Sequence, residues 1–308
     1  MPLELAYTFP APELGATLCE EGFKAIGSLS KSNAVGKVVC PAGCESGDGE
    51  KICILGFLGL TSVIERQTAS LRSLAGTSAD FGFRIGARPG ESLDIFRKAQ
   101  FAAVTRANAV SANATEPVLD TLRAVSRTNV GVFDSWAGWK EGVASHPSLL
   151  VLIVHKDKEN DRHIIEIGNG QFAAVTQIKE SYVDPDKSTH PVVLLVGCST
   201  GVSETEFQNL PIQFQDSGAA LVVGTVATVL GRDAGPVTAE LIRTMAELSN
   251  LPNMAMGDAL LRTKQKMVSQ GKLMALCLSS YGDSGWLITA PAKSSQQSLS
   301  VTVTHAQD

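Results

Sequence analysis

The chain of 308 residues has no excess of positive charge, no long apolar run and no dense set of cysteines, and each absence excludes a class of protein. Its formal net charge is −5, so nothing in its charge predicts a nucleic-acid-binding face. No apolar stretch reaches the roughly 20 residues that a membrane-spanning helix needs, so no membrane contact is predicted. The first residues lack both the basic and the apolar region of a secretory signal, which favours a cytoplasmic location.

The six cysteines are too few to predict a disulfide framework in a chain of this length, and a reducing cytoplasm would keep them as free thiols. Cys40, Cys44 and Cys53 suggest a metal site, with Cys19 as the fourth ligand that zinc requires. The other interpretation is that these thiols are incidental, because zinc ligands usually come in more closely spaced pairs. We adopt the second interpretation and predict neither a metal nor a cofactor.

What the chain does contain is an ordinary globular composition, arranged as alternating strands and helices. Hydrophobic residues make up 44% and charged residues 19%, which is enough apolar material for a large core. From about residue 101, short apolar runs alternate with segments of helical periodicity, and this order predicts a three-layer α/β sandwich with a mainly parallel central sheet. We divide the chain into an N-terminal elaboration (1–100) that can belong to the same domain, the α/β domain (101–291) and a flexible tail (292–308).

Two unbroken apolar runs end on residues that can carry out chemistry. Residues 191–197 lead to Cys198, and residues 148–154 lead to His155. Such runs are typical of strands buried on both faces of a parallel sheet, and ligands bind beyond the carboxyl ends of these strands. A cysteine and a histidine at that edge form the pair that activates a thiolate nucleophile. The alternatives are a thiol packed in the core and a histidine hydrogen-bonded at its rim.

The segment after the histidine strand predicts an inserted β-hairpin. Residues 156–162 are polar and predict a turn. Residues 163–168 and 171–175 are short apolar runs, and they are joined through Gly168-Asn-Gly170. Two such runs connected by a glycine-containing turn are typical of a hairpin.

A further helix is predicted from about residue 258 to residue 269, where Gly271 ends it. Lys264 and Lys266 lie within this helix. Charged residues in a helix usually form its solvated face, so we expect both lysines to be exposed.

Several short motifs between residues 149 and 287 match a known family. They are Leu-Ile-Val-His155, Glu166-Ile-Gly168, Val-Gly-Cys198-Ser-Thr-Gly201, Gly218-Ala-Ala-Leu-Val-Val-Gly-Thr, Gly257-Asp-Ala-Leu-Leu261 and Gly-Asp283-Ser-Gly-Trp286. Through them, this stretch resembles the CHAT domain, a caspase-like peptidase module of the group that contains caspases, separase and gingipains. Upstream, Gly56-Phe-Leu-Gly-Leu and Val63-Ile-Glu-Arg-Gln67 resemble a segment found before such domains.

The resemblance implies a caspase-like fold and a cysteine endopeptidase that cleaves a protein partner under the control of a regulatory signal or partner. His155 and Cys198 take the positions of the family's catalytic dyad. The family commonly has a glycine after the histidine, where its amide helps to form the oxyanion hole. Here that residue is Lys156, and its amide and the Cys198 amide are the expected donors. Asp283 and Asp233 are candidate lining residues of the substrate pocket, with solvated loop charges as the alternative.

A second function stays open beside the peptidase. Lys156 in place of glycine is compatible with a module that keeps the peptidase fold, has lost its chemistry and acts as a scaffold or sensor. A nucleotide-binding enzyme would need a glycine-rich loop between a strand and a helix, and the sequence has no such loop.

Overall fold

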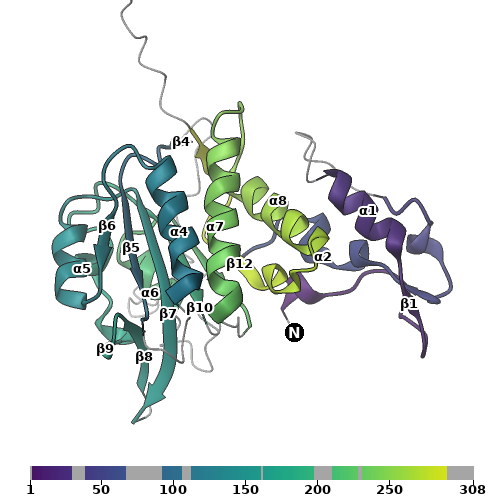
Figure 1. The fold of residues 1–308 in the computed structure, drawn as a ribbon, viewed down its shortest axis with the longest axis horizontal. Coiled ribbons are helices and arrows are strands. Elements are labelled where there is room, and N and C mark those ends of the chain that lie inside the picture. Colours follow the sequence, from purple (N-terminus) through teal and green to yellow (C-terminus); the bar gives the residue numbers. More distant parts are fainter. Residues whose placement is uncertain are drawn as a thin grey trace, which may run out of the picture.

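The computed structural model shows a central β-sheet with helices on both faces and a smaller N-terminal unit at one edge (Figure 1). It describes residues 2–29, 39–66, 92–105, 112–160, 162–197, 210–227 and 231–289. We call the first two of these ranges the N-terminal unit. Across the described residues, no helix combines the length and the apolar character that crossing a membrane requires.

The central sheet has the strand order β3-β12-β11-β10-β7-β5-β6 among the described residues. Each neighbouring pair in this order is parallel except β11 and β12, so the prediction of a mainly parallel sheet is confirmed. The strands are β3 (Glu65–Arg66), β5 (Ala99–Ala103), β6 (Gly131–Phe133), β7 (Leu149–Glu159), β10 (Val192–Gly197), β11 (Leu221–Thr225) and β12 (Leu278–Tyr281).

Helices pack on both faces of this sheet. Successive side chains of a strand point to opposite faces, so Val151 of β7 enters one core and Leu152 enters the other. The first core lies beneath α4 (Ala112–Val125) and α7 (Gly231–Leu248), and the second beneath α5 (Trp136–Val143) and α6 (Leu210–Asp216). The predicted three-layer α/β sandwich is therefore confirmed.

A three-stranded meander extends from the end of β7. β7 pairs antiparallel with β8 (Arg162–Ile167), which pairs antiparallel with β9 (Gln171–Ala174). The predicted hairpin after the histidine strand is confirmed, but the turn predicted at residues 156–162 is wrong, because residues 156–159 continue β7. This polar sequence can form a strand because the end of β7 lies outside the central sheet and its last three residues are exposed.

The N-terminal unit has a small core that it shares with Val268 and Leu276 from late in the chain. It contains β1 (Thr17–Leu18), β2 (Lys51–Ile52), α1 (Glu20–Leu29) and α2 (Leu58–Thr61), and both helices pack against α8 (Met256–Ser269). A second small sheet pairs β4 (Ser92–Leu93) with β13 (Leu287–Ile288). Short 3-10 helices complete the described structure at Leu3–Leu5, Cys44–Ser46, Ile54–Gly56, Val175–Gln177, Glu180–Tyr182 and Leu273–Cys277.

An ionic contact between buried Glu4 and partly exposed Arg66 joins the N-terminal unit to the central sheet. Arg66 of β3 donates from Nη2 to Glu4 Oε2 at 2.7 Å and from Nε to Ser279 Oγ at 3.0 Å. The Ser279 hydroxyl donates to the other carboxylate oxygen of Glu4. Burial alone would raise the pKa of Glu4, but the hydrogen bonds from Ser279 and Arg66 hold it below its ordinary value. Residues before position 100 thus contribute a strand to the sheet, and the domain division at that position stays a prediction.

Lys264 in α8 is only 3% exposed, so the prediction that it lies on a solvated face is wrong. The reason is that α8 packs between α7 and the N-terminal unit, an arrangement that the helix's own sequence does not reveal. Lys266 is partly exposed, and its ammonium group lies 2.6 Å from Glu240 Oε1. Burial lowers the pKa of Lys264 to about 8, although the negative charge of Glu4 opposes the shift.

Replacing Lys264 with methionine should change how stability depends on pH. Between pH 8 and pH 10.5 the unfolded chain holds a proton on Lys264 that the folded chain does not, so the stability of the wild type rises with pH across this window. We expect the free energy of unfolding of the wild type, relative to Lys264→Met, to rise by about 3 kcal/mol over that range. Urea unfolding at several pH values measures it. Because burial raises the pKa of Cys277 and the charge of Lys264 lowers it, both chains should carry Cys277→Ala so that this thiol does not contribute. A pH-independent difference between them would contradict the prediction.

Candidate active site

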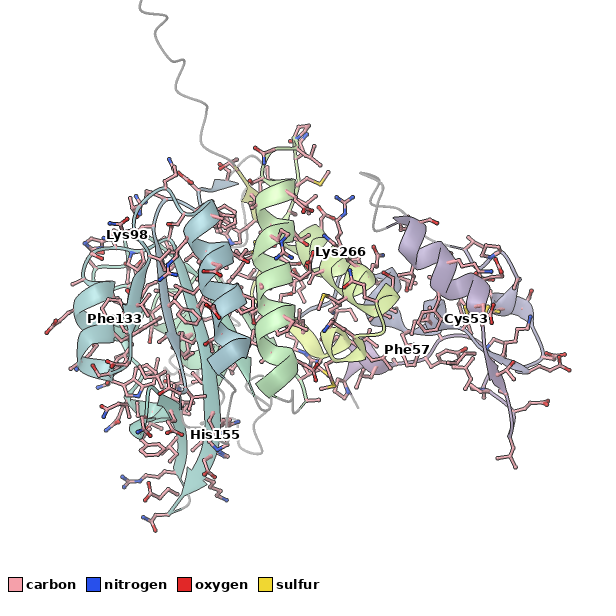
Figure 2. The ribbon with its side chains drawn as sticks, viewed as in Figure 1. Cys53, Phe57, Lys98, Phe133, His155 and Lys266 are labelled. Carbon is pink, nitrogen blue, oxygen red and sulfur yellow. The ribbon has the colours of Figure 1, made fainter. Side chains whose placement is uncertain are left out.

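The pairing of β7 with β10 determines which residues meet at the carboxyl edge of the sheet. The two strands are parallel, and their last registered pair is Val154 with Gly197. His155 follows Val154 directly, and Figure 2 shows it where β7 leaves the sheet. Cys198 follows Gly197 in the sequence and lies outside the described residues, so its side chain has no structural description.

His155 is a partly exposed side chain with an acidic neighbour on its own strand. Its side chain is 30% exposed, and its Nε2 lies 3.8 Å from Asp157 Oδ2. Residues two apart on a strand lie on the same face, which is why these two groups are close. The Asp157 side chain is 61% exposed, so water screens this contact and it is a weak one.

A buried carboxylate faces the histidine from the neighbouring strand. Glu166 of β8 is the direct antiparallel partner of His155, so both side chains lie on the same face of the meander. Glu166 is fully buried, and its Oε1 accepts a hydrogen bond from the Gly170 amide at 2.9 Å. Sequence reasoning assigned Glu166 no role in the site. The available signal was a carboxylate inside an apolar run, His163-Ile-Ile-Glu-Ile-Gly168, where burial of a charge needs a reason.

Gly168 anchors the meander to the carboxyl end of β5. Its amide donates to Ala103 O at 2.8 Å, and its carbonyl accepts from the Thr105 amide at 2.7 Å. Its φ is +56°, and a Cβ at this position would collide with the backbone carbonyl oxygen of Asp134. Only glycine therefore permits this close approach, which positions the strand that carries Glu166.

The end of β10 is held from the other side by β11. The Thr225 hydroxyl donates to the carbonyl oxygen of Gly197, the last described residue before Cys198. Thr225 is fully buried. The peptide that leads to the thiol is thus anchored by β7 on one side and by β11 on the other.

The two predicted pocket residues, Asp233 and Asp283, lie near opposite ends of the strands of the central sheet. Asp233 is in the first turn of α7, which follows the carboxyl end of β11, so it is on the His155 side. Asp283 follows β12, which runs antiparallel to β11 and ends beside Val222, at the opposite edge. Its Oδ1 accepts from the Gly285 amide at 2.7 Å within its own turn. The structure therefore does not bring Asp283 to the histidine, because β12 runs against the other strands.

Lys156 also occupies a different setting from the one expected. It lies within β7 and pairs with Ile165 of β8, so its backbone belongs to a strand ladder rather than a turn. The roles of the Lys156 and Cys198 amides as oxyanion donors stay predictions.

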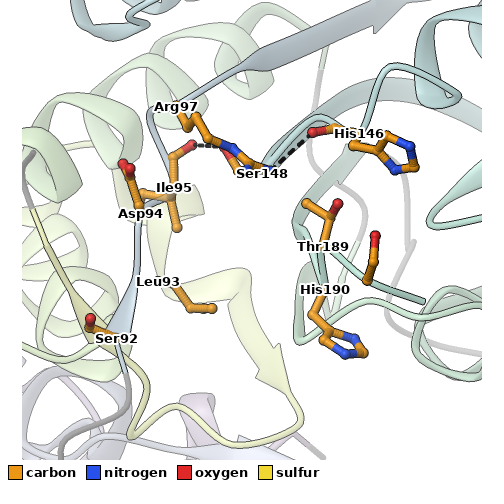
Figure 3. Close-up of a pocket in the computed structure, with 10 residues that line it drawn as sticks. Ser92, Leu93, Asp94, Ile95, Arg97, His146, Ser148, Thr189 and His190 are labelled. Atoms are coloured by element: carbon orange, nitrogen blue, oxygen red, sulfur yellow. Dashed lines mark hydrogen bonds between the residues drawn. The ribbon is translucent and has the colours of Figure 1, made fainter. Parts of the chain in front are cut away.

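A pocket of about 460 Å³ lies at the amino edge of the sheet, opposite His155 (Figure 3). His146 and Ser148 precede β7, and His190 precedes β10, which places all three at the starts of the strands. This pocket therefore contains neither of the strand ends that carry the predicted dyad. Its lining residues are Ser92, Leu93, Asp94, Ile95, Arg97, His146, Ser148, Ser188, Thr189 and His190.

No protein-family model matches the chain, and no curated protein sequence matches it. Solved structures match it in part. The complex of the pro- and mature domains of RgpB from Porphyromonas gingivalis shares 13% identity at a TM-score of 0.47, covering 63% of this chain and 49% of that one. The separase–securin complex of Saccharomyces cerevisiae shares 11% identity at a TM-score of 0.39, covering 64% and 13%. The chain spans about half of the RgpB chain, and at these values the similarity assigns it neither a family nor an activity.

Replacing Gly168 with alanine should disturb the candidate site, whereas replacing Gly170 should not. Both glycines have positive φ, at +56° and +72°, but only Gly168 faces a backbone collision. We expect Gly168→Ala to lower the free energy of unfolding by about 2–5 kcal/mol, from strain plus overpacking, and Gly170→Ala by about 1–2 kcal/mol from strain alone. Chemical denaturation measures both. Equal losses in the two variants would show that the contact with Asp134 does not constrain the meander.

Proposed function

We propose that this chain is a cysteine endopeptidase of the CHAT group, in which Cys198 is the nucleophile and His155 its base. The observation that supports this most is the register of β7 and β10. Val192, Leu194 and Val196 of β10 enter the same core as Ile153 of β7. The proposal extends this alternation by one residue beyond the last registered pair, Gly197 with Val154, and on that basis we expect Cys198 and His155 to share a face.

The reaction follows from the chemistry of the two groups. The Cys198 thiolate attacks the carbonyl carbon of the peptide, and the Cys198 amide, with Lys156 as the second donor, stabilises the oxyanion. His155 in its protonated form then gives a proton to the leaving amine, which breaks the C–N bond and leaves an acyl-enzyme. His155 then takes a proton from water, whose oxygen attacks the thioester carbon. The C–S bond breaks, the acyl part leaves as a carboxylic acid, and Cys198 returns to the thiolate with His155 protonated. Glu166 and Asp157 would act as positioning residues on the His155 face.

The substrate and location are part of the same proposal. Of the two predicted pocket residues, Asp233 is the one on the His155 side of the sheet, and an acidic lining favours lysine or arginine at the cleaved position. We infer a protein substrate and control by a regulatory protein or signal. A reducing cytoplasm would keep Cys198 as a thiol.

The dyad predicts that His155 controls the reactivity of Cys198. We expect wild-type Cys198 to be alkylated by iodoacetamide faster than Cys277, and His155→Ala to slow this alkylation by about 10-fold or more near neutral pH, because the base no longer helps to form the thiolate. Mass spectrometry of tryptic peptides measures each site separately. Cys277 serves as the internal control, since it is buried and outside the candidate site.

Peptide cleavage tests the activity itself. A peptide library that varies the residue before the cleaved bond, with candidate activating proteins added, should give products with the wild type and the Cys277→Ala control. Cys198→Ala should give none, and cleavage by Cys198→Ala would overturn the assignment. The scaffold alternative, which Lys156 in a strand ladder favours, predicts instead that His155→Ala leaves Cys198 alkylation unchanged.

A further inference from the structure

Four cysteines from three separate segments converge in the N-terminal unit. We call Cys19, Cys40, Cys44 and Cys53 the four-cysteine cluster. Their Sγ atoms all lie within 4.8 Å of one another. The Sγ atoms of Cys19 and Cys40 are 3.6 Å apart, and Cys44 Sγ lies 3.5 Å from each of them. Figure 2 shows Cys53 in this unit, far from His155.

The local fold explains how each thiol reaches the cluster. β1 and β2 are parallel with Leu18 opposite Ile52, so the next residue on each strand is a cysteine at the same level. The Cys19 amide continues this pairing by donating to Ile52 O at 3.0 Å. The other two thiols come from one tight turn, in which Gly43, with φ +66°, donates its amide to Cys40 O at 2.9 Å.

The sulfur spacing fits a tetrahedral metal site better than disulfides. Four thiolates about 2.3 Å from a zinc ion lie about 3.8 Å from one another in a tetrahedron. A disulfide would bring two sulfurs to about 2.05 Å. The spacings of 3.5–3.6 Å among Cys19, Cys40 and Cys44 are close to the first value and far from the second, and Cys53 Sγ lies within 4.8 Å of these atoms.

The residues around the cluster also favour a metal site, because they bury the sulfurs and donate a hydrogen bond to one of them. Cys19 and Cys40 are 2% exposed and Cys53 is fully buried. Gly22, in the first turn of α1, donates its amide to Cys19 Sγ at 3.4 Å, the kind of bond that a metal-bound thiolate accepts. A Cβ on Gly22 would lie 2.7 Å from Cys53 Sγ, so the helix can approach the sulfurs only with glycine there.

We propose that the four-cysteine cluster binds one zinc ion through all four thiolates, as a closed structural site. Four soft thiolate ligands suit zinc, and a site without an open position leaves no room for a reacting water. Cys44 is the partly exposed member and borders a hollow of about 180 Å³, which provides a path for the ion. This proposal does not depend on the peptidase activity.

The zinc site would hold together the two chain segments that reach the central sheet, residues 2–19 and residues 53–66. The Cys53 amide donates to the Tyr7 hydroxyl at 3.0 Å, and the Leu58 amide donates to Ala6 O at 2.9 Å. The segment with Tyr7 also contains Glu4, and the segment with Cys53 continues to Arg66. Arg66 pairs with Glu4 and donates a hydrogen bond to Ser279 of β12. A unit this small gains stability from such a crosslink, because a small hydrophobic core alone gives little stability.

Metal analysis of the full chain, purified under reducing conditions without added metal, tests the proposal. Elemental mass spectrometry should find one zinc per chain in the wild type and in the Cys277→Ala control, which removes a buried cysteine outside the cluster. Cys53→Ser should reduce the zinc to background. Because Cys44 is the partly exposed member, we expect Cys44→Ser to stay folded, which circular dichroism checks. Zinc loss in a folded Cys44→Ser separates ligand loss from unfolding. Zinc retained in both serine variants, or iron or disulfides in place of zinc in the wild type, would overturn the proposal.

Two measurements on the wild type need no variant. The metal-free chain titrated with Co²⁺ should develop the strong visible absorption of tetrahedral cobalt–thiolate, saturating at one equivalent, and zinc should bleach it. Removing zinc with a chelator should speed amide hydrogen exchange in residues 2–29 and 39–66, while β7, β10 and β11 stay protected. No visible band with Co²⁺, or exchange unaffected by the chelator, would contradict a structural zinc site.

Discussion

The parallel pairing of β7 and β10 is the constraint on which the proposed chemistry depends. Six consecutive residue pairs, from Val192 with Leu149 to Gly197 with Val154, fix the relative height of the two strand ends. Both strands are buried on both faces along this pairing, so a slip of one residue would exchange the side chains of the two cores. The apolar packing of the sheet, rather than any polar contact, therefore determines that His155 and Gly197, the last described residue before Cys198, lie at the same ends of their strands.

The central strands and the hairpin could be predicted from the sequence, because local patterns of apolar residues and glycines determine them. The runs before His155 and Cys198 predicted the central strands, and the Gly168-Asn-Gly170 turn predicted the hairpin. Other features could not be predicted, because they depend on contacts with residues far away in the sequence. Residues 156–159 form a strand only because β8 pairs with them, and Asp283 lies at the other edge because β12 pairs antiparallel. Lys264 is buried by the N-terminal unit, which its own helix does not reveal.

The N-terminal unit is attached to the sheet by an ion pair and is held together internally by the four-cysteine cluster. At one end, buried Glu4 and partly exposed Arg66 form an ion pair against Ser279 of the sheet. At the other end, the four-cysteine cluster gathers the segments that carry these residues. The spacing in Cys40-Pro-Ala-Gly-Cys44 favoured incidental thiols, because zinc ligands usually come as closer pairs. The parallel register of two-residue strands, invisible in the sequence, is what supplies the remaining two thiols.

The most direct test of the central claim is the distance between the Cys198 sulfur and the His155 ring in an experimental structure of the full chain, with a thiol-reactive peptide inhibitor bound. The strand register predicts that Sγ and one ring nitrogen lie within roughly 4 Å, the reach over which a base assists a nucleophile. A separation beyond about 7 Å, with the inhibitor attached to another cysteine, would contradict the assignment of the dyad.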